Sequence, residues 1–312
     1  MTIHNKSLYN LVTVLGPTAS SKTSFAAHLA LKLNGEVISA DSRQVYRHMN
    51  LGTGKDYDDY TIHGISVPCH LIDIVDPGYK YNVFEYQQDF VKAYNNITAR
   101  GRLPVLCGGT GLYIDAAIRG YRLIPVPPNE KLREELSAKS LDELTDMLAS
   151  MKKLHNHTDV DTKARAVRAI EIERYYHDQS AIVQDYPAIR NLCLGIKFDR
   201  FTERKRITER LHKRLATGMI DEVKDLLDRG LSAESIVYYG LEYKYITYYL
   251  LEKLSYDAMV EQLNIAIRQF AKRQRTWFRK MEREGTTIHW IAGEMPMEEK
   301  LDIALELFNR KK

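Results

Sequence analysis

The chain has 312 residues, a mass of 36.1 kDa and a formal net charge of +4, with 44% hydrophobic residues and a mean hydropathy of −0.38. This composition is typical of a soluble globular protein, and no stretch approaches the ~18 consecutive apolar residues of a membrane helix. Cys69, Cys107 and Cys193 are widely spaced, which argues against a disulfide framework or a zinc site and favours the reducing cytoplasm.

The first predicted elements are a buried strand at residues 11–15, a phosphate loop at 16–23 and a helix at 23–33. The loop follows the P-loop pattern of Gly, four residues and Gly-Lys-Ser/Thr, except that Ser21 stands in place of the second glycine. In such a loop backbone N–H groups and the positive end of the helix surround phosphate oxygens. Lys22 would add a charge and the Thr23 hydroxyl would hold Mg²⁺. An ordinary strand-to-helix turn is the weaker alternative. The expected loop residues are Gly16, Pro17, Thr18, Ala19, Ser20, Ser21, Lys22 and Thr23.

Further short strands are predicted at residues 36–40, 103–107, 192–198 and 287–291, separated by helical sequence. This alternation indicates a buried parallel sheet, in which ligands bind beyond the carboxyl ends of the strands. Asp41 and the glycine turn at 108–111 each follow such a strand, so we expect them on the same rim as the phosphate loop. A carboxylate at that rim suits a general base or a Mg²⁺ ligand, although an Asp-Ser pair also caps helices.

A proline-rich segment, with Pro125, Pro127 and Pro128, interrupts this pattern before a charged helical stretch that runs from 129 to about 154. We therefore predict a helical insertion at 122–190 within a catalytic core made of 1–121 plus 191–312. The C-terminal third, 200–281, is expected to be mostly helical. The predicted fold class is α/β, with a P-loop parallel sheet core.

A basic helix with interleaved aromatic residues is predicted at 268–279. Arg268, Lys272, Arg275 and Arg279 are spaced by four, three and four residues and therefore share a face, and no acid occurs between Glu261 and Glu282. A face of one sign favours nucleic-acid or phosphate contact over an ordinary surface helix. Other basic residues cluster at 200–214 and, in the insertion, at 163–168.

These stretches resemble the tRNA dimethylallyltransferases, also called tRNA isopentenylpyrophosphate transferases. The match runs in family order over about 11–281 and is most specific in the run Ala-Lys-Arg-Gln-x-Thr-Trp-Phe-Arg at 271–279. Other matching stretches are Gly-Pro-Thr-Ala at 16–19, Asp-Ser at 41–42, Gly-Thr at 52–53, Gly-Gly-Thr-Gly-Leu-Tyr at 108–113 and Arg-Ala-Ile-Glu at 168–171. The resemblance implies a nucleoside-kinase-like core. It also implies transfer of a dimethylallyl group from dimethylallyl diphosphate to N6 of adenosine 37, in tRNAs that read codons beginning with U.

The resemblance also assigns roles to residues. Asp41 would be the general base, while Thr110, Arg206, the phosphate loop and Mg²⁺ on Thr23 would stabilise the departing pyrophosphate. If the position of Ser21 needs a positive φ, serine costs about 1–3 kcal/mol there. Contacts to the tRNA anticodon stem-loop are implied for the insertion and for Asp41, Ser42, Arg43, Gln44, Arg165, Arg168, Lys272, Arg273, Gln274, Arg275, Trp277 and Arg279. A cytoplasmic monomer without a membrane partner is expected.

Three alternatives remain open at this point. An adenylate isopentenyltransferase would use the same loop and aspartate on a free nucleotide, but it would not need the basic helix at 268–279. An ATP-dependent small-molecule kinase usually carries an aspartate after the strand at 103–107, where this chain has glycine; Asp73 or Asp76 would have to replace it. A non-catalytic RNA-binding module would have no use for a phosphate loop opposite Asp41.

Overall fold

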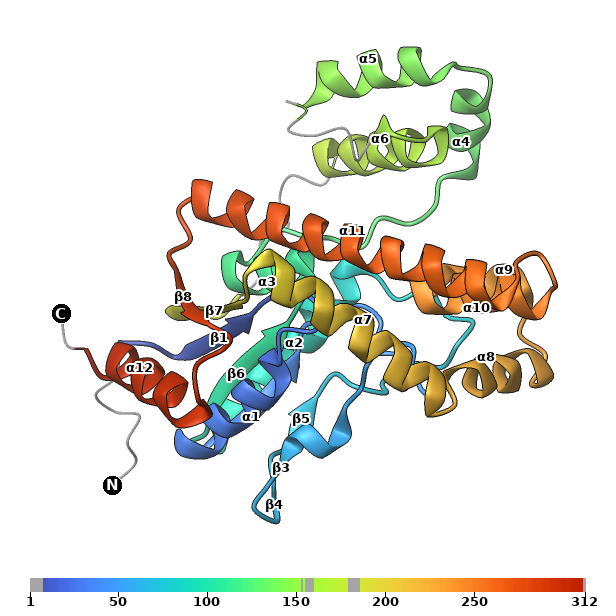
Figure 1. Ribbon diagram of the computed structural model, residues 1–312. Helices are drawn as coiled ribbons and strands as arrows, with labels where there is room; N and C mark the ends of the chain where they lie inside the picture. Colours follow the sequence, from blue (N-terminus) through green and yellow to red (C-terminus); the bar gives the residue numbers. More distant parts are fainter. Residues whose placement is uncertain (1–7, 153, 155–159, 179–185, 311–312) are drawn as a thin grey trace. The chain divides into compact units, whose positions relative to one another are not determined.

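Six parallel strands form the centre of the protein in a computed structural model that describes residues 8–152, 154, 160–178 and 186–310. Their order across the sheet is β5 (Cys69–His70), β2 (Gly35–Ser39), β6 (Leu103–Gly108), β1 (Leu11–Leu15), β7 (Asn191–Lys197) and β8 (Ile288–Ala292) (Figure 1). The five strands predicted from sequence are confirmed to within one residue at each end. Two-residue β5 was missed, as was the small hairpin of β3 (Thr61–Ile62) and β4 (Ile65–Ser66), because such short segments leave no periodic signal.

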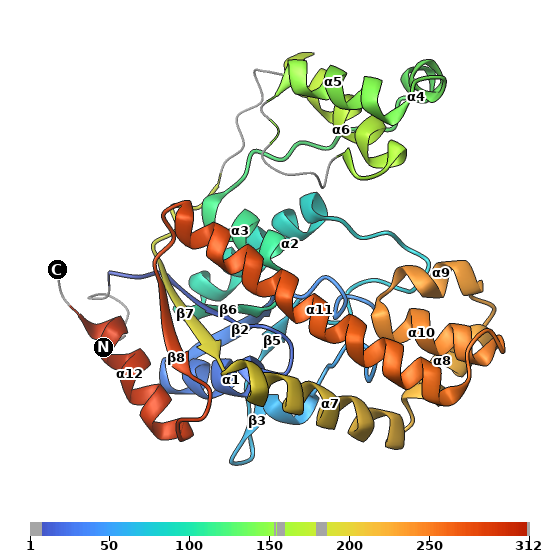
Figure 2. The same ribbon diagram turned by 45° about the horizontal axis from the view of Figure 1, so that its top comes forward.

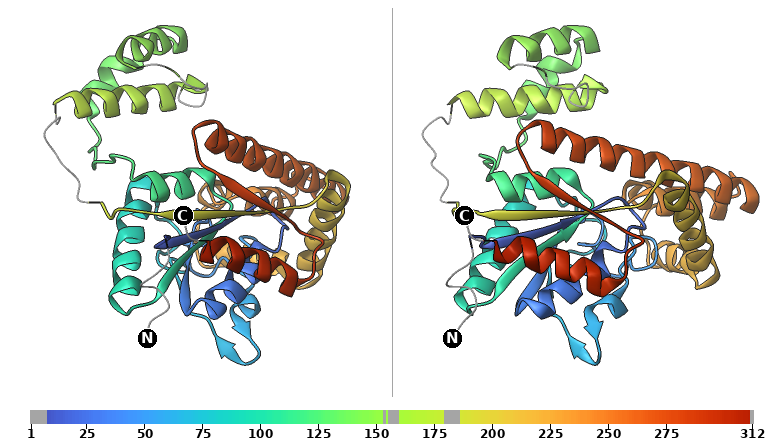
Figure 3. Two further views of the ribbon diagram at one scale, coloured as in Figure 1. Left: turned by 90° about the vertical axis from the view of Figure 1, so that its left-hand side faces the viewer. Right: turned by 60° about the vertical axis from the view of Figure 1, so that its left-hand side comes forward.

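Helices cover both faces of this sheet (Figure 3). On one face α1 (Lys22–Lys32) and α12 (Met297–Asn309) bury Phe25, Leu29 and Phe308 against the strands. On the other lie α2 (Val83–Ala99) and α3 (Gly111–Arg119). Because both faces are covered, every residue of the central strand β1 is buried, which explains why all of its residues except Thr13 are apolar.

The remaining helices of this unit come from the C-terminal third, as predicted (Figure 2). They are α7 (Arg200–Ala216), α8 (Met219–Asp228), α9 (Ala233–Tyr238), α10 (Leu241–Leu250) and α11 (Tyr256–Arg283). The 28-residue α11 contacts α3, α7 and α10, so it links the sheet layer to the outer helices. A short 3₁₀ helix, η2 (Tyr57–Tyr60), packs near α1.

A second unit is formed by residues 122–186, whereas 1–121 and 187–312 make up the first. Sequence analysis placed the insertion at 122–190, of which 153, 155–159 and 179–185 lie outside the described residues. The helices α4 (Glu130–Ser137), α5 (Leu141–Met151) and α6 (Lys163–Asp178) build a core of their own. The helical stretch predicted from 129 to about 154 forms two helices, α4 and α5, and Ser140 caps α5 in a reciprocal pair with Glu143. The small core comprises Leu132, Leu136, Leu144, Leu148, Val160, Ala166, Ala169 and Ile170.

Among the helices that the structure describes, none has the length and apolar character needed to cross a membrane.

Candidate active site

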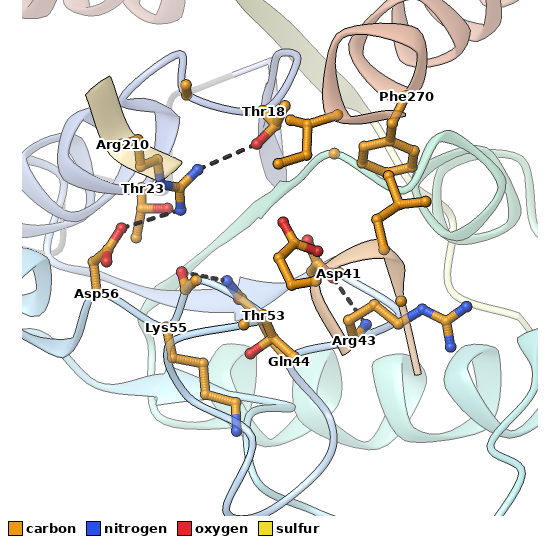
Figure 4. Close-up of a pocket in the computed structure, with 18 of the residues that line it drawn as sticks. Thr18, Thr23, Asp41, Arg43, Gln44, Thr53, Lys55, Asp56, Arg210 and Phe270 are labelled. Carbon is orange, nitrogen blue, oxygen red and sulfur yellow. Dashed lines mark hydrogen bonds and ion pairs between the residues drawn. The ribbon is translucent and has the colours of Figure 1, made fainter. Parts of the chain in front are cut away.

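Three loops at the carboxyl ends of β1, β2 and β6 meet around a cavity of about 1380 Å³ (Figure 4). They bring the phosphate-loop residues 18–23, the turn at 41–44 and Thr110 to one wall, on the shared rim that the strand ends predicted. Helices α7, α9, α10 and α11 supply the other walls. Two regions about 190 residues apart in the sequence, around Thr18 and Arg210, thus face the same space.

The phosphate loop holds two L-residues in the left-handed region of backbone space. Ala19 has φ 60° and Ser21 has φ 57°. Ser21 directly precedes α1, and its side chain does not cap that helix. Glycine adopts this conformation without steric cost, whereas serine is disfavoured by about 1–3 kcal/mol. The sequence-based expectation of strain at Ser21 is therefore confirmed.

Arg206 on α7 offsets that strain by binding both unusual residues. Its Nε donates to the Ala19 carbonyl at 2.9 Å, and Nη2 donates to the Ser21 hydroxyl at 2.6 Å. The guanidinium also lies 4.4 Å from the centroid of the Phe198 ring. Because the planar guanidinium has donors on both sides, one side chain can bind two points of the loop and stack on an aromatic ring. Arg206 therefore reaches the phosphate loop, where the resemblance placed its role.

One helical turn further along α7, Arg210 and Arg214 form a basic wall, within the cluster of basic residues that the sequence shows at 200–214. Arg210 donates to the Thr18 hydroxyl and to Asp56, both at 3.2 Å, while Arg214 lies 3.1 Å from Asp56. Burial and, to a smaller extent, the neighbouring charge of Arg214 lower the pKa of Arg210 to about 10. The guanidinium therefore stays charged at neutral pH. The spacing of four residues from Arg206 to Arg210 to Arg214 was the available signal.

The lysine of the loop is enclosed by protein as well. Lys22 donates to the Pro17 carbonyl at 3.3 Å, and burial lowers its pKa from the usual 10.5. A buried ammonium without a full complement of partners favours an anion nearby. The cavity wall thus presents positive charge from Lys22, Arg206 and Arg210 around the loop.

Asp41 and Thr110 are neighbours at the centre of the cavity wall. An Asp41 carboxylate oxygen accepts the Arg43 backbone N–H at 2.8 Å, and the Thr110 hydroxyl accepts the Ser42 N–H at 3.0 Å. These bonds fix the turn after β2 to the turn after β6. In Figure 4 the Asp41 carboxylate points into the cavity, between the Arg210 side and the Phe270 side. Gln44 is held by Ser39 and by the Gly54 carbonyl, to which its amide donates at 3.0 Å.

Helix α11 packs so closely on the glycine turn that side chains at two glycines would collide with it. A Cβ on Gly111 would lie 2.2 Å from the Trp277 ring, and one on Gly109 would lie 2.4 Å from the Gln274 amide. Gln274 donates to the Gly109 carbonyl at 2.9 Å and accepts the Thr18 N–H at 2.8 Å. It is 5% exposed. The structure thus places Gln274 as a bridge between two loops, where the sequence analysis expected an RNA contact.

The basic face of α11 differs from the predicted stripe. Arg268 donates to the Thr208 hydroxyl at 3.0 Å and Arg275 pairs with Glu203, so both are turned toward α7. Lys272, Arg273 and Arg279 are exposed and form no ion pair with any described residue. Arg273 faces the cavity together with Phe270 and Trp277. Some basic residues of this helix therefore bind α7, whereas the others remain on the exposed surface.

Other predicted residues lie away from the cavity wall. Gly16, Pro17, Lys272, Arg275 and Arg279 are outside its lining. Arg165 and Arg168 belong to the second unit, where Arg165 pairs with Asp161 and Arg168 binds Glu171 and the Val126 carbonyl. Asp73 pairs with buried Lys55, and Asp76 lies 3.1 Å from Arg47. Since neither aspartate lines the cavity, the suggestion that one of them replaces the kinase aspartate is wrong.

Glu222 on α8 is a further contributor, to which the sequence analysis assigned no role. Its carboxylate accepts the backbone N–H groups of Asn50, Leu51 and Gly52 at 2.7–3.0 Å, and the Tyr243 hydroxyl at 2.7 Å. A carboxylate with several such donors is well satisfied in a protein interior. The loop at 50–54, which ends beside Asp56, is therefore tied to the C-terminal helices.

The parallel sheet and the strand–loop–helix at 11–32 define a P-loop α/β protein in which the phosphate loop and the Asp41 carboxylate line one cavity. A sequence profile of the IPP transferase family matches residues 44–281. Over 303 residues the chain is 58% identical to tRNA dimethylallyltransferase 2 of Phocaeicola vulgatus, covering 97% of this chain and 99% of that protein. The chain belongs to the IPP transferase family, a family of prenyl-transferring enzymes.

Solved structures agree with this assignment. The tRNA isopentenylpyrophosphate transferase of Bacillus halodurans is 33% identical, with a TM-score of 0.68 and coverage of 96% of this chain and 97% of its own. A eukaryotic dimethylallyltransferase acting on tRNA has a TM-score of 0.78 at 21% identity, covering 96% of this chain and 80% of its own. At that identity the second likeness supports the fold alone.

Proposed function

We propose that the protein transfers a dimethylallyl group from dimethylallyl diphosphate to N6 of adenosine 37 in tRNAs that read codons beginning with U. The observation that supports this most directly is the juxtaposition of a phosphate loop and Asp41 on the wall of one cavity. The relatives named above, and their stated action on tRNA, supply the acceptor.

The proposed acceptor needs a base because the lone pair of an adenine amino group is delocalised into the ring. Asp41 takes a proton from N6 as the bond from N6 to the allylic carbon forms, and the bond from that carbon to the diphosphate oxygen breaks. A positioned base of this kind contributes ~10²–10⁴ in rate. The Arg43 N–H on one carboxylate oxygen orients Asp41 for this task, and the Thr110 hydroxyl holds the next residue of the turn through the Ser42 N–H.

The leaving group carries away the bonding electrons as pyrophosphate. Backbone N–H groups of the loop, Lys22 and Arg206 would stabilise its charge, and each such preorganised donor contributes ~10²–10³ in rate in well-studied cases. Arg210 adds a second guanidinium beside Thr18. The positive wall of the cavity thus matches the charge that develops during transfer.

The donor set of the cavity fits Mg²⁺ carried by the substrate. Within the described residues no group of three or more His, Cys, Asp or Glu side chains is arranged to hold a metal. Mg²⁺ commonly uses one or two protein ligands and completes its shell with water and substrate phosphates. The Thr23 hydroxyl on the cavity wall would be such a ligand. When bound, Mg²⁺ would neutralise part of the charge on the diphosphate.

The test is a transfer assay with Mg²⁺ and radiolabelled dimethylallyl diphosphate. The acceptors are an anticodon stem-loop that carries A36-A37-A38, the same stem-loop with A37 replaced by inosine, which lacks the amino group, and free AMP. Label on the first RNA alone is expected. Label on AMP would indicate an adenylate prenyltransferase, and absence of label on every acceptor would contradict the proposal. Asp41→Asn serves as the inactive control.

A further inference from the structure

An exposed tyrosine lines the cavity and has no role in the chemistry described above. Tyr238, the last residue of α9, lines the cavity and is 44% exposed. Its neighbour Tyr239 is 2% exposed and packs in the interior. An exposed aromatic ring on the wall of a substrate cavity can stack against a planar ligand that enters the cavity.

Two cations already lie against the Tyr238 ring. The Arg43 guanidinium is 5.3 Å from the ring centroid, and the Lys80 ammonium is 5.8 Å from it. Arg43 belongs to the turn that carries Asp41, whose carboxylate accepts the Arg43 N–H. Arg43 therefore connects the turn of the proposed base to the Tyr238 ring.

The support beneath this cluster is well anchored. The Tyr239 hydroxyl accepts the Gly78 N–H, and the Tyr239 ring packs edge-on against Tyr46 with 4.6 Å between ring centroids. The Tyr46 hydroxyl in turn accepts the Tyr81 N–H at 3.2 Å. The segment that carries Lys80 is thus held on both sides by buried tyrosines. Because Tyr239 supplies the packing, Tyr238 is free to serve a ligand.

We propose that Tyr238, Arg43 and Lys80 form a stacking site for the nucleobase adjacent to the adenosine that reacts. Proteins bind single-stranded RNA by stacking its bases on aromatic rings and guanidinium planes, while lysines neutralise the phosphates. The neighbouring base stacks on Tyr238 beside Arg43, and Lys80 contacts its phosphate. The proposal rests on the RNA acceptor of the proposed function. It adds a reason for selecting RNA over AMP, since a mononucleotide has no neighbouring base.

The site also addresses how the target adenosine leaves its stack. Moving one base out of a loop costs a few kcal/mol, because its stacking on both neighbours is lost. A protein ring that receives a neighbouring base replaces part of that stacking. Tyr238 would in this way hold the flanking nucleotide while the target base occupies the space next to Asp41.

The experiment is a binding cycle between protein and RNA variants, measured by fluorescence anisotropy. The proteins are wild type, Tyr238→Ala, Tyr238→Phe and, as a matched control, Tyr256→Ala, which removes a ring of equal 44% exposure outside the cavity. The RNAs are the anticodon stem-loop and two versions with an abasic nucleotide at position 36 or 38. Affinity for dimethylallyl diphosphate and the melting temperature are measured for every protein.

Tyr238→Ala should weaken binding of the intact stem-loop by about 5- to 150-fold, the range for loss of one base–aromatic stack. Tyr238→Phe should retain most of the affinity. One of the two abasic RNAs should bind the wild-type protein more weakly than the intact RNA does. The Tyr238→Ala protein should bind that abasic RNA and the intact RNA equally well, because the contact between ring and base is already absent in this variant. Lys80→Ala should reduce the slope of log affinity against log salt by about one.

Three results would overturn the proposal. The first is that Tyr238→Ala and each abasic site reduce the RNA affinity independently, so that their effects multiply. The second is that Tyr238→Ala reduces the RNA affinity no more than Tyr256→Ala does, and the third is that Tyr238→Ala reduces the affinities for RNA and for dimethylallyl diphosphate equally, which would indicate a structural role. Binding is measured without turnover. Failure of the proposed transfer reaction would therefore show in the labelling assay with wild type, separately from the outcome of this cycle.

Discussion

At the scale of single residues, Ser21 shows how an unfavourable local conformation is supported by a distant side chain. The loop needs a left-handed residue before α1, and serine disfavours it. The same hydroxyl, however, accepts a hydrogen bond from Arg206, which glycine could not do. Compared with the glycine of the P-loop pattern, Ser21 thus has a less favourable backbone conformation but gives Arg206 a second hydrogen-bond partner.

Two variants separate these effects. Ser21→Ala keeps the strain and loses the hydroxyl, so the free energy of unfolding should fall by about 0.5–1.5 kcal/mol. Ser21→Gly also loses the hydroxyl but relieves about 1–2 kcal/mol of left-handed strain, so its stability should return close to that of wild type. Both should raise the KM for dimethylallyl diphosphate to a similar extent, because Arg206 loses one anchor in each. Urea unfolding and transfer kinetics test this; greater stability of the alanine variant would refute the strain argument.

Asp41 can be tested without disturbing the turn around it. The asparagine oxygen of Asp41→Asn still accepts the Arg43 N–H but cannot take a proton. We expect kcat to fall by ~10²–10⁴ while affinities for tRNA and dimethylallyl diphosphate change little. Single-turnover rates and anisotropy would measure the two effects. Equal losses in rate and in RNA affinity would mean that Asp41 positions the RNA and is not the base.

We expect Lys22 to make binding of the proposed diphosphate substrate sensitive to alkaline pH. Burial lowers its pKa from 10.5, so in the folded protein it loses its proton at a lower pH than in the unfolded chain. Between the lowered pKa and 10.5 the unfolded state binds more protons, and this group therefore makes stability rise with pH. Affinity for diphosphate changes in the opposite direction, because the anion favours the charged form. Titration calorimetry should show affinity falling in that window for wild type, and a smaller fall for Lys22→Arg, which stays charged.

At the scale of elements, α11 has a structural task in addition to its exposed basic residues. Gln274 joins the phosphate loop to the glycine turn, and Trp277 packs against Gly111. Arg268 and Arg275 fix the helix to α7, which carries Arg206 and Arg210. The helix therefore sets the positions of both walls of the phosphate site.

Gln274→Ala tests this bridge. It leaves the Thr18 N–H and the Gly109 carbonyl without their partner, which should cost about 1–3 kcal/mol of stability. Affinity for dimethylallyl diphosphate should fall as well, since the loop loses its support. Thr276→Ala is the matched control, because the Thr276 hydroxyl bonds within α11 and lies outside the cavity. If Gln274→Ala reduced only the affinity for RNA, the result would support a direct contact of Gln274 with tRNA, as the resemblance implied.

At the scale of the whole molecule, the two units have separate hydrophobic cores. All six strands of the sheet and every residue that lines the cavity belong to the first unit. The helices of the second unit pack on one another through their own buried leucines. This separation allows the binding of the two substrates to be tested independently.

Replacing residues 122–186 with a Gly/Ser linker should leave the first unit folded and able to bind dimethylallyl diphosphate. Affinity for the anticodon stem-loop should fall, because the insertion is proposed to contact it. Circular dichroism, diphosphate binding and RNA anisotropy would measure the three properties. Unchanged RNA affinity would place the whole anticodon contact on the first unit.

The sequence by itself determined the elements whose signals are local. The strands at 11–15 and 103–107, the loop with Lys22 and the carboxylate at 41 follow from apolar runs, spacing and the rule that ligands bind at strand ends. The resemblance added the family. Short strands such as β5 gave no such signal, because two residues show no period.

Only the tertiary structure decided which faces of the helices meet the cavity. The spacing of Arg268, Lys272, Arg275 and Arg279 predicted a common face, but the helix packs against α7 and α3 at the same time, so two of the four bind α7. The packing of the helices likewise places Gln274 between the phosphate loop and the glycine turn, and it brings Arg210 to the cavity wall. Helical periodicity fixes which side chains share a face, whereas the partner of that face depends on contacts between segments far apart in the sequence.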